Sequence, residues 1–141
     1  CSGEQGPGQW PETGRRAVIS VGTDILRVSR IEEVVARQGE RFVRRILTQS
    51  EQAEYASSKQ AIRLLAKRFA AKEAVAKALG TGIGRSVSWQ DICVEHDPSG
   101  APKVVLSGGA RAVALARGGS RVELSLADEL EYVVAFAVLA A

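Results

Sequence analysis

Residues 60–79 form the longest uninterrupted helix-forming segment of the chain, and they constrain its fold more than any other feature. The segment reads QAIRLLAKRFAAKEAVAKAL and is rich in Ala, Leu and Lys, which all favour a helix. It contains neither Gly nor Pro and is followed by Gly80, a residue type that commonly ends helices. The sequence therefore predicts a helix over residues 60–79.

The elements on either side of this helix are shorter. Helices are predicted over residues 29–36 with Gly39 as the stop, over 40–46, after Ser50 as the N-cap, and over 109–116. Strands are predicted over residues 17–25, 88–95, 103–107, 121–126 and 132–139, with a turn at 97–100 that makes 88–107 a hairpin. This order predicts an α+β fold, in which a small antiparallel sheet packs with one long helix and shorter helices. The last strand is apolar at nearly every position, which predicts burial on both faces and suggests a subunit interface.

Composition limits the class of protein. The 141 residues suffice for one domain, which we expect over residues 17–141, with residues 1–16 as a flexible tail or an artificial extension. Lys and Arg exceed Asp and Glu by 19 to 16, a net charge of +3 that favours an anionic partner. No run approaches the roughly 18 apolar residues of a membrane span, and no secretory signal is visible. Cys1 and Cys93 make no disulfide framework, so we expect reduced thiols and a cytoplasmic protein.

Two carboxylates stand out. On a helical wheel Glu73 falls inside the apolar stripe of the long helix, although a buried carboxylate is rare unless it is paired or binds a cation. One interpretation is an ion pair with Lys77 one turn away, and the other is a metal ligand. Asp24 follows Gly22 and Thr23 at the end of the first strand, where it could be a site residue or a cap.

The glycine-rich segment after the long helix reads Gly80-Thr81-Gly82-Ile83-Gly84-Arg85. Its backbone N–H groups could turn toward a phosphate. The order is helix and then glycine, however, so neither a P-loop nor a dinucleotide fingerprint fits. Its spacing alone favours a helix C-cap with a tight turn.

Several of these motifs together resemble the bacterial holo-acyl-carrier-protein synthases, which are small 4′-phosphopantetheinyl transferases. The resemblance covers roughly residues 17–141. It is carried by Gly22-Thr23-Asp24, Arg41-Phe42, Arg45-Ile46-Leu47, Arg68-Phe69-Ala70-Ala71-Lys72-Glu73-Ala74, Lys77, Gly80-Thr81-Gly82-Ile83-Gly84, Ser125-Leu126-Ala127-Asp128-Glu129 and Tyr132. Each fragment alone is unspecific, whereas the combination is specific.

The resemblance implies transfer of 4′-phosphopantetheine from coenzyme A to a serine of apo acyl carrier protein, with release of adenosine 3′,5′-bisphosphate, in fatty acid biosynthesis. It also implies that Asp24 and Glu73 bind Mg²⁺ together with phosphate oxygens. Lys77 then contacts the coenzyme A phosphates, as do Gly80, Thr81 and Gly82. Glu73 and Lys77 are the catalytic residues that it implies, and the base for the serine is either Glu73 or a water on the metal.

Three further expectations follow from the same resemblance. Arg30, Arg37, Arg41 and Arg45 should face an acidic carrier protein rather than nucleic acid. The assembly should be a homotrimer with active sites between subunits. Glu123 stands where the family commonly has a histidine near coenzyme A, so it should either point away or alter phosphate binding. The alternatives are another coenzyme A-dependent transferase, such as an acyltransferase without an essential metal, and a basic binding module in which Glu73 and Lys77 are merely an ion pair.

Overall fold

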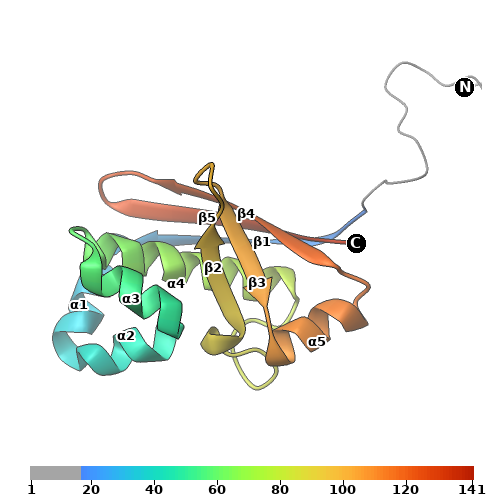
Figure 1. The fold of residues 1–141 in the computed structure, drawn as a ribbon, viewed down its shortest axis with the longest axis horizontal. Helices are drawn as coiled ribbons and strands as arrows, with labels where there is room; N and C mark the ends of the chain where they lie inside the picture. The colour runs from blue at the N-terminus through green and yellow to red at the C-terminus, as the bar shows by residue number, and fades with distance from the viewer. Residues whose placement is uncertain (1–16) are drawn as a thin grey trace, which may run out of the picture.

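The computed structural model describes residues 17–141, so the tail expected over residues 1–16 lies outside the described residues. Figure 1 shows the long helix α4 (Ala61–Ala78) against a three-stranded antiparallel sheet. The strands of this sheet follow the order β1 (Val18–Arg27), β5 (Tyr132–Ala140) and β4 (Arg121–Asp128). A separate hairpin consists of β2 (Ile92–His96) and β3 (Pro102–Leu106). The remaining helices are α1 (Val28–Gln38), α2 (Glu40–Ile46), α3 (Gln49–Ser57), the 3₁₀ turn η1 (Trp89–Asp91) and α5 (Gly108–Ala116). The predicted α+β fold is confirmed.

Helix α4 is buried on nearly every side. It contacts β1 and β5 of the sheet on one side, and α1, α3 and β2 on the other. Its alanines at positions 66, 70, 71, 74, 76 and 78 are all buried, and such small side chains let neighbouring elements approach closely. The helix is therefore the centre of the core rather than an amphipathic surface helix. Among the described residues, no helix is both long and apolar enough to cross a membrane.

The sheet has one buried and one exposed face. On β5 the side chains of Val133, Ala135, Ala137 and Leu139 are buried against α4, whereas Val134 and Phe136 on the other face are each 40% exposed. The prediction that the last strand is buried on both faces is therefore wrong for the single chain. Its apolar outer face continues onto the neighbouring strand through Val21 and Ile25 of β1.

Two elements begin at other residues than predicted, and in both cases a capping interaction explains the difference. The N-cap of helix α3 is Thr48 and not Ser50. The Thr48 hydroxyl accepts a hydrogen bond from Glu51 N, and Glu51 Oε1 accepts one from Thr48 N (2.8 Å). The strand predicted from residue 88 begins only at Ile92, because Asp91 bonds back to Ser88 N (3.2 Å) and closes the 3₁₀ turn. The helix ends predicted at Gly39 and Gly80 are confirmed, and both glycines have positive φ.

Candidate active site

A glycine brings the first strand against the long helix. Alternate residues of β1 face α4, and a Cβ on Gly22 would lie 2.2 Å from Ala74 O and 2.5 Å from Ala78 N. No other residue could occupy this position without moving the strand away. Two residues further along the same face, Asp24 is therefore held beside the C-terminal half of α4.

Asp24 lies in an ion pair with the predicted catalytic lysine. Lys77 Nζ is 3.3 Å from Asp24 Oδ1 and donates to the Thr23 carbonyl oxygen (3.0 Å). The Asp24 side chain is 17% exposed and that of Lys77 is 52% exposed, so the pair lies at the edge of the core and remains open to solvent. The interpretation of Glu73 and Lys77 as an ion pair is therefore corrected, because the Lys77 amine forms its ion pair with Asp24.

Glu73 completes this group from the neighbouring turn of α4. Its side chain is half-buried, and burial followed by repulsion from Asp24 raises the pKa of Glu73, while Lys77 acts in the opposite direction. Asp24, Glu73 and Lys77 therefore form one cluster, with two carboxylates that share a single ammonium. At Glu73 the effects of burial and of Asp24 together outweigh that of Lys77.

The donor set of this cluster fits a hard divalent cation. Mg²⁺ is commonly held by one or two carboxylates and takes its other ligands from phosphates and water. No group of three or more His, Cys, Asp or Glu side chains suited to a metal occurs in residues 17–141, so the chain itself supplies two carboxylates at this point. A cation here would offset both the burial and the repulsion from Asp24 that raise the pKa of Glu73.

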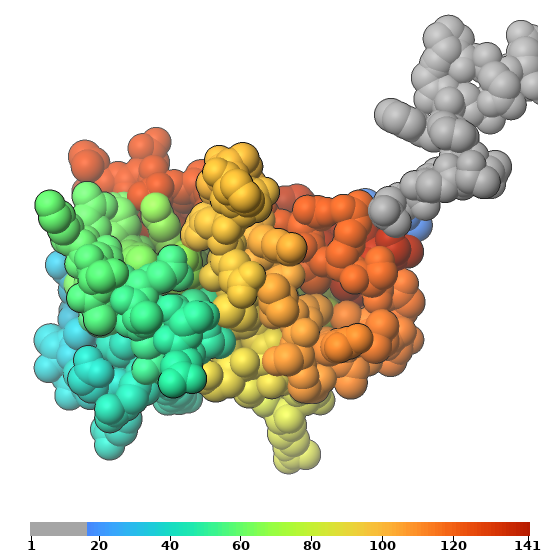
Figure 2. Space-filling view, in the orientation of Figure 1, coloured from blue at the N-terminus to red at the C-terminus, as the bar shows by residue number. Residues whose placement is uncertain are grey.

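The glycine-rich loop continues directly from this cluster. Gly80 N donates to Lys77 O (2.9 Å), and both Thr81 N and Gly82 N donate to Ala76 O (3.3 and 3.0 Å). The backbone donors of all three residues thus complete the end of α4, which confirms the helix C-cap interpretation. Phosphate binding by the loop stays a prediction. Beyond it, the exposed segment between α4 and β2 projects from the surface (Figure 2).

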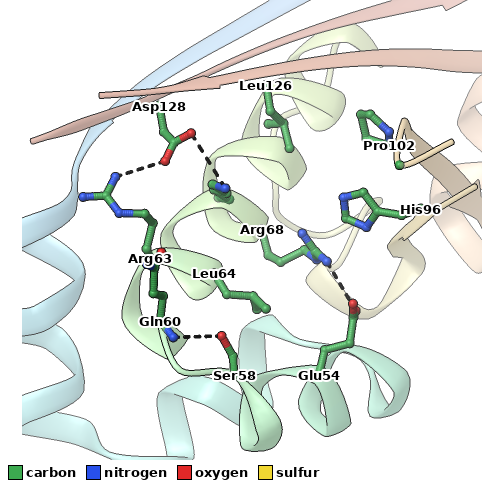
Figure 3. Close-up of a pocket in the computed structure, with 12 residues that line it drawn as sticks. Glu54, Ser58, Gln60, Arg63, Leu64, Arg68, His96, Pro102, Leu126 and Asp128 are labelled. Carbon is green, nitrogen blue, oxygen red and sulfur yellow. Dashed lines mark hydrogen bonds and ion pairs between the residues drawn. The ribbon is translucent and has the colours of Figure 1, made fainter. Parts of the chain in front are cut away.

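A basic pocket lies on the other side of α4, next to β4 (Figure 3). It has a volume of about 390 Å³, and its charged lining includes Arg63, Lys67, Arg68, Glu54 and Asp128. Asp128 pairs with Arg63 (3.2 Å) and Lys67 (3.7 Å), and Glu54 accepts from Arg68 Nη2 (3.3 Å). The sequence predicted no pocket here, because the residues that face the helix come from distant segments.

The fully buried charges of the helix belong to a network that sequence reasoning missed. Lys72 Nζ donates to Glu51 Oε1 (2.6 Å), to Ile46 O (2.7 Å) and to Trp89 O (3.1 Å), and both charged side chains are completely buried. The available signal was the Thr48-x-x-Glu51 capping motif, whose glutamate serves the cap and the lysine together. Arg68 joins the network with Nε 3.8 Å from Glu51 Oε2.

The predicted carrier-facing arginines are surface residues. Arg30 and Arg37 on α1, and Arg41 and Arg45 on α2, are all exposed. Glu123 is exposed on the outer face of β4, opposite to α4, where it forms an ion pair with Arg121. It therefore points away from Asp24 and Glu73 of its own chain.

Comparisons with known proteins identify the family of the chain. A family model described as the 4′-phosphopantetheinyl transferase superfamily matches residues 20–137. The holo-[acyl-carrier-protein] synthase of Shewanella frigidimarina is 52% identical over 123 residues, which cover 87% of this chain and 98% of the relative. That of Vibrio cholerae is 47% identical over 122 residues, covering 86% and 97%.

Solved structures give the same assignment. The holo-[acyl-carrier-protein] synthase of Neisseria meningitidis superposes with a TM-score of 0.83 at 41% identity, covering 87% of this chain and 98% of that one. The Helicobacter pylori enzyme in complex with coenzyme A superposes with a TM-score of 0.74 at 30% identity, covering 84% and 98%. The chain therefore belongs to the 4′-phosphopantetheinyl transferase superfamily and, within it, to the holo-[acyl-carrier-protein] synthase family.

Proposed function

We propose that this chain transfers 4′-phosphopantetheine from coenzyme A to a serine of an apo acyl carrier protein, releasing adenosine 3′,5′-bisphosphate, as a step that serves fatty acid biosynthesis. The observation that carries the proposal is the cluster of Asp24, Glu73 and Lys77, in which two carboxylates share one ammonium and the pKa of Glu73 is raised. A site with this imbalance suits a cation together with a phosphate-rich substrate.

Asp24 and Glu73 would hold Mg²⁺ in this proposal. When bound, the cation neutralises the charge that builds on the leaving phosphate. Lys77 binds the phosphate oxygens from the solvent side, where its 52% exposed side chain can exchange Asp24 for substrate. The raised pKa of Glu73 also suits a carboxylate that accepts the proton of the serine hydroxyl. Gly80, Thr81 and Gly82 would lie beside the bound phosphates, because they follow Lys77 directly at the end of α4.

Coenzyme A carries phosphate at two places, a pyrophosphate and a 3′-phosphate, and the chain has two charged sites to match them. The carboxylate cluster lies beside β1 at one edge of the sheet, whereas the basic pocket lies beside β4 at the other edge. The central strand β5 separates the two edges. We infer that one coenzyme A molecule uses the carboxylate cluster of one subunit and the basic pocket of its neighbour.

The outer face of the sheet supports the homotrimer that this arrangement needs. Val21, Ile25, Val134 and Phe136 expose between 40% and 65% of their surface on adjacent strands of one sheet face. A contiguous apolar patch of this kind marks a protein interface rather than a solvated surface. The arginines of α1 and α2 remain outside this face and would dock the acidic carrier protein. Cys93 is a free thiol, which fits the cytoplasmic setting expected from the sequence.

The test is the mass of an apo acyl carrier protein after incubation with the chain, coenzyme A and Mg²⁺. We expect a gain of one phosphopantetheine group, its loss on addition of EDTA, and at least a hundredfold slower transfer by Asp24→Asn and Glu73→Gln. Glu95→Gln removes an exposed charge on β2 and is the matched control. Phosphopantetheine transfer that survives EDTA would contradict the metal site, whereas EDTA-insensitive gain of an acyl group from an acyl-coenzyme A would favour an acyltransferase. A melting temperature indifferent to coenzyme A and Mg²⁺ would favour a basic binding module.

A further inference from the structure

Arg68 is an almost fully buried cation whose donors are incompletely used. Its side chain is 3% exposed and lines the basic pocket. Its Nε is the one buried side-chain polar atom of residues 17–141 recorded without a hydrogen-bond partner. A guanidinium has five N–H donors, and leaving them unpaired away from water is unfavourable. Nε lies 3.8 Å from the buried Glu51 Oε2, so the part of the guanidinium that a ligand could share is Nη2, which contacts Glu54 at 3.3 Å.

The two carboxylates that face Arg68 differ in their freedom to move. Glu51 is completely buried and also accepts from Lys72 Nζ, Thr48 N and Val94 N, so it cannot leave its position. Glu54, one turn further along α3, is 48% exposed and touches Arg68 Nη2 at 3.3 Å. Figure 3 shows this contact between Arg68 and Glu54 among the residues that line the pocket. Of the two, Glu54 is the carboxylate that can swing away into solvent.

The Arg63 ion pair of the pocket is held more firmly than the Arg68–Glu54 pair. Arg63 pairs with Asp128 and in addition donates to the carbonyl oxygens of Glu129 and Leu130 (both 2.7 Å). These main-chain bonds fix Arg63 whether or not a ligand is present. The Arg68–Glu54 contact has no such support, and a half-exposed ion pair of this kind contributes little to stability.

We propose that Glu54 is a built-in competitor of the substrate phosphate for Arg68, so that binding of the nucleotide end of coenzyme A opens the Arg68–Glu54 contact. This inference rests on the proposed function, because it takes the basic pocket as the second phosphate position. Glu51 holds the guanidinium in place during the exchange, while Glu54 moves out. The contact weakens nucleotide binding and thereby speeds the release of adenosine 3′,5′-bisphosphate.

The test is isothermal titration of adenosine 3′,5′-bisphosphate into wild-type protein, Glu54→Gln and Glu54→Asp. Glutamine removes the charge, whereas aspartate keeps the charge but is one methylene too short for the 3.3 Å contact. Displacing an exposed ion pair should weaken binding about two- to fivefold, so both variants should bind more tightly by that factor. The gain should shrink at about 0.5 M salt. Glu33→Gln removes an exposed charge on α1 and should leave the affinity unchanged.

The outcomes separate the inference from the function on which it rests. If Glu54→Asp binds the nucleotide like wild type while Glu54→Gln binds it more tightly, charge repulsion between residue 54 and the phosphate explains the result. The proposal that Glu54 competes for Arg68 is then overturned. If neither variant differs from wild type, the competitor is likewise overturned while the pocket stands. If wild-type protein does not bind the nucleotide at all, the proposed pocket fails and the inference fails with it. Thermal melts of both variants should match wild type, because neither removes a buried group.

Discussion

Replacing Lys72 by methionine should destabilise the fold more than any surface change. Lys72 Nζ makes three hydrogen bonds of 2.6 to 3.1 Å, and its removal leaves the buried Glu51 carboxylate with two backbone N–H donors and the more distant Arg68. Breaking one side of a buried ion pair costs about 3–5 kcal/mol. The two carbonyl oxygens that lose their donor add to this loss, and methionine keeps most of the apolar packing.

The assay is urea unfolding followed by far-ultraviolet circular dichroism at equal protein concentrations, because the proposed trimer formation would also affect the midpoint. With a denaturant slope of about 2 kcal/mol per molar urea, the midpoint should fall by about 1.5–2.5 M. The double variant Lys72→Met with Glu51→Gln removes both charges. It should therefore lose at least about 2 kcal/mol less than the sum of the single variants.

Two results would refute this reasoning. A loss below about 1 kcal/mol for Lys72→Met would mean that the carboxylate is satisfied without its lysine. Strict additivity of the two changes would mean that the 2.6 Å contact between Lys72 and Glu51 carries no coupling energy. Either outcome would mean that the Lys72–Glu51 network adds little to the free energy of unfolding.

Three further predictions concern the site and the assembly. Gly22→Ala should destabilise the protein by about 3 kcal/mol or more in urea unfolding, because its Cβ would overlap Ala74 O, and wild-type stability would contradict the close approach. Because burial and Asp24 raise the pKa of Glu73, that carboxyl contributes stability below its unfolded value of 4.5 and loses it as the pH rises through the folded value. Glu73→Gln should therefore raise the metal-free melting temperature at pH 7 but not near pH 4, and an unchanged difference across this range would contradict the shift. Phe136→Lys should shift the assembly toward monomer in size-exclusion chromatography with light scattering, and an unaltered trimer would exclude this sheet face from the interface.

The elements that could be predicted from the sequence are those set by local chemistry. The helix over residues 60–79 follows from propensity and from Gly80, and the observed α4 spans Ala61–Ala78. Gly22 carried a local signal too, because a glycine inside a strand marks a close backbone approach, and α4 is the element that approaches. The observed element boundaries differ from the predicted ones where a side chain accepts a hydrogen bond from the main chain, as Glu51 does from Thr48 N.

The partners of the charged side chains on α4 could not be predicted, because they depend on how distant segments pack together in the fold. A helical wheel singled out Glu73, but α4 is covered on nearly all sides, so the wheel could not show that the adjacent Lys72 is the completely buried charge. The partner of Lys72 is 21 residues away, and the partner of Lys77 is 53 residues away. Only the resemblance to a known family joined Asp24 to Glu73 before the structure did.

The buried and half-buried charges around α4 are of two kinds: those whose partners all come from the chain, and those that retain room for a ligand. The second kind marks the candidate site. Lys72 and Glu51 satisfy each other and four further backbone groups, so they need nothing from outside the chain. Glu73 and Arg68 are left short: one has a raised pKa, and the other has a buried donor without a partner. Arg68 is paired with Glu51 and Glu54, and of these two carboxylates only Glu54 is free to move into solvent. In the proposed function a cation would offset the burial and the repulsion at Glu73, and a phosphate oxygen would replace Glu54 at Arg68.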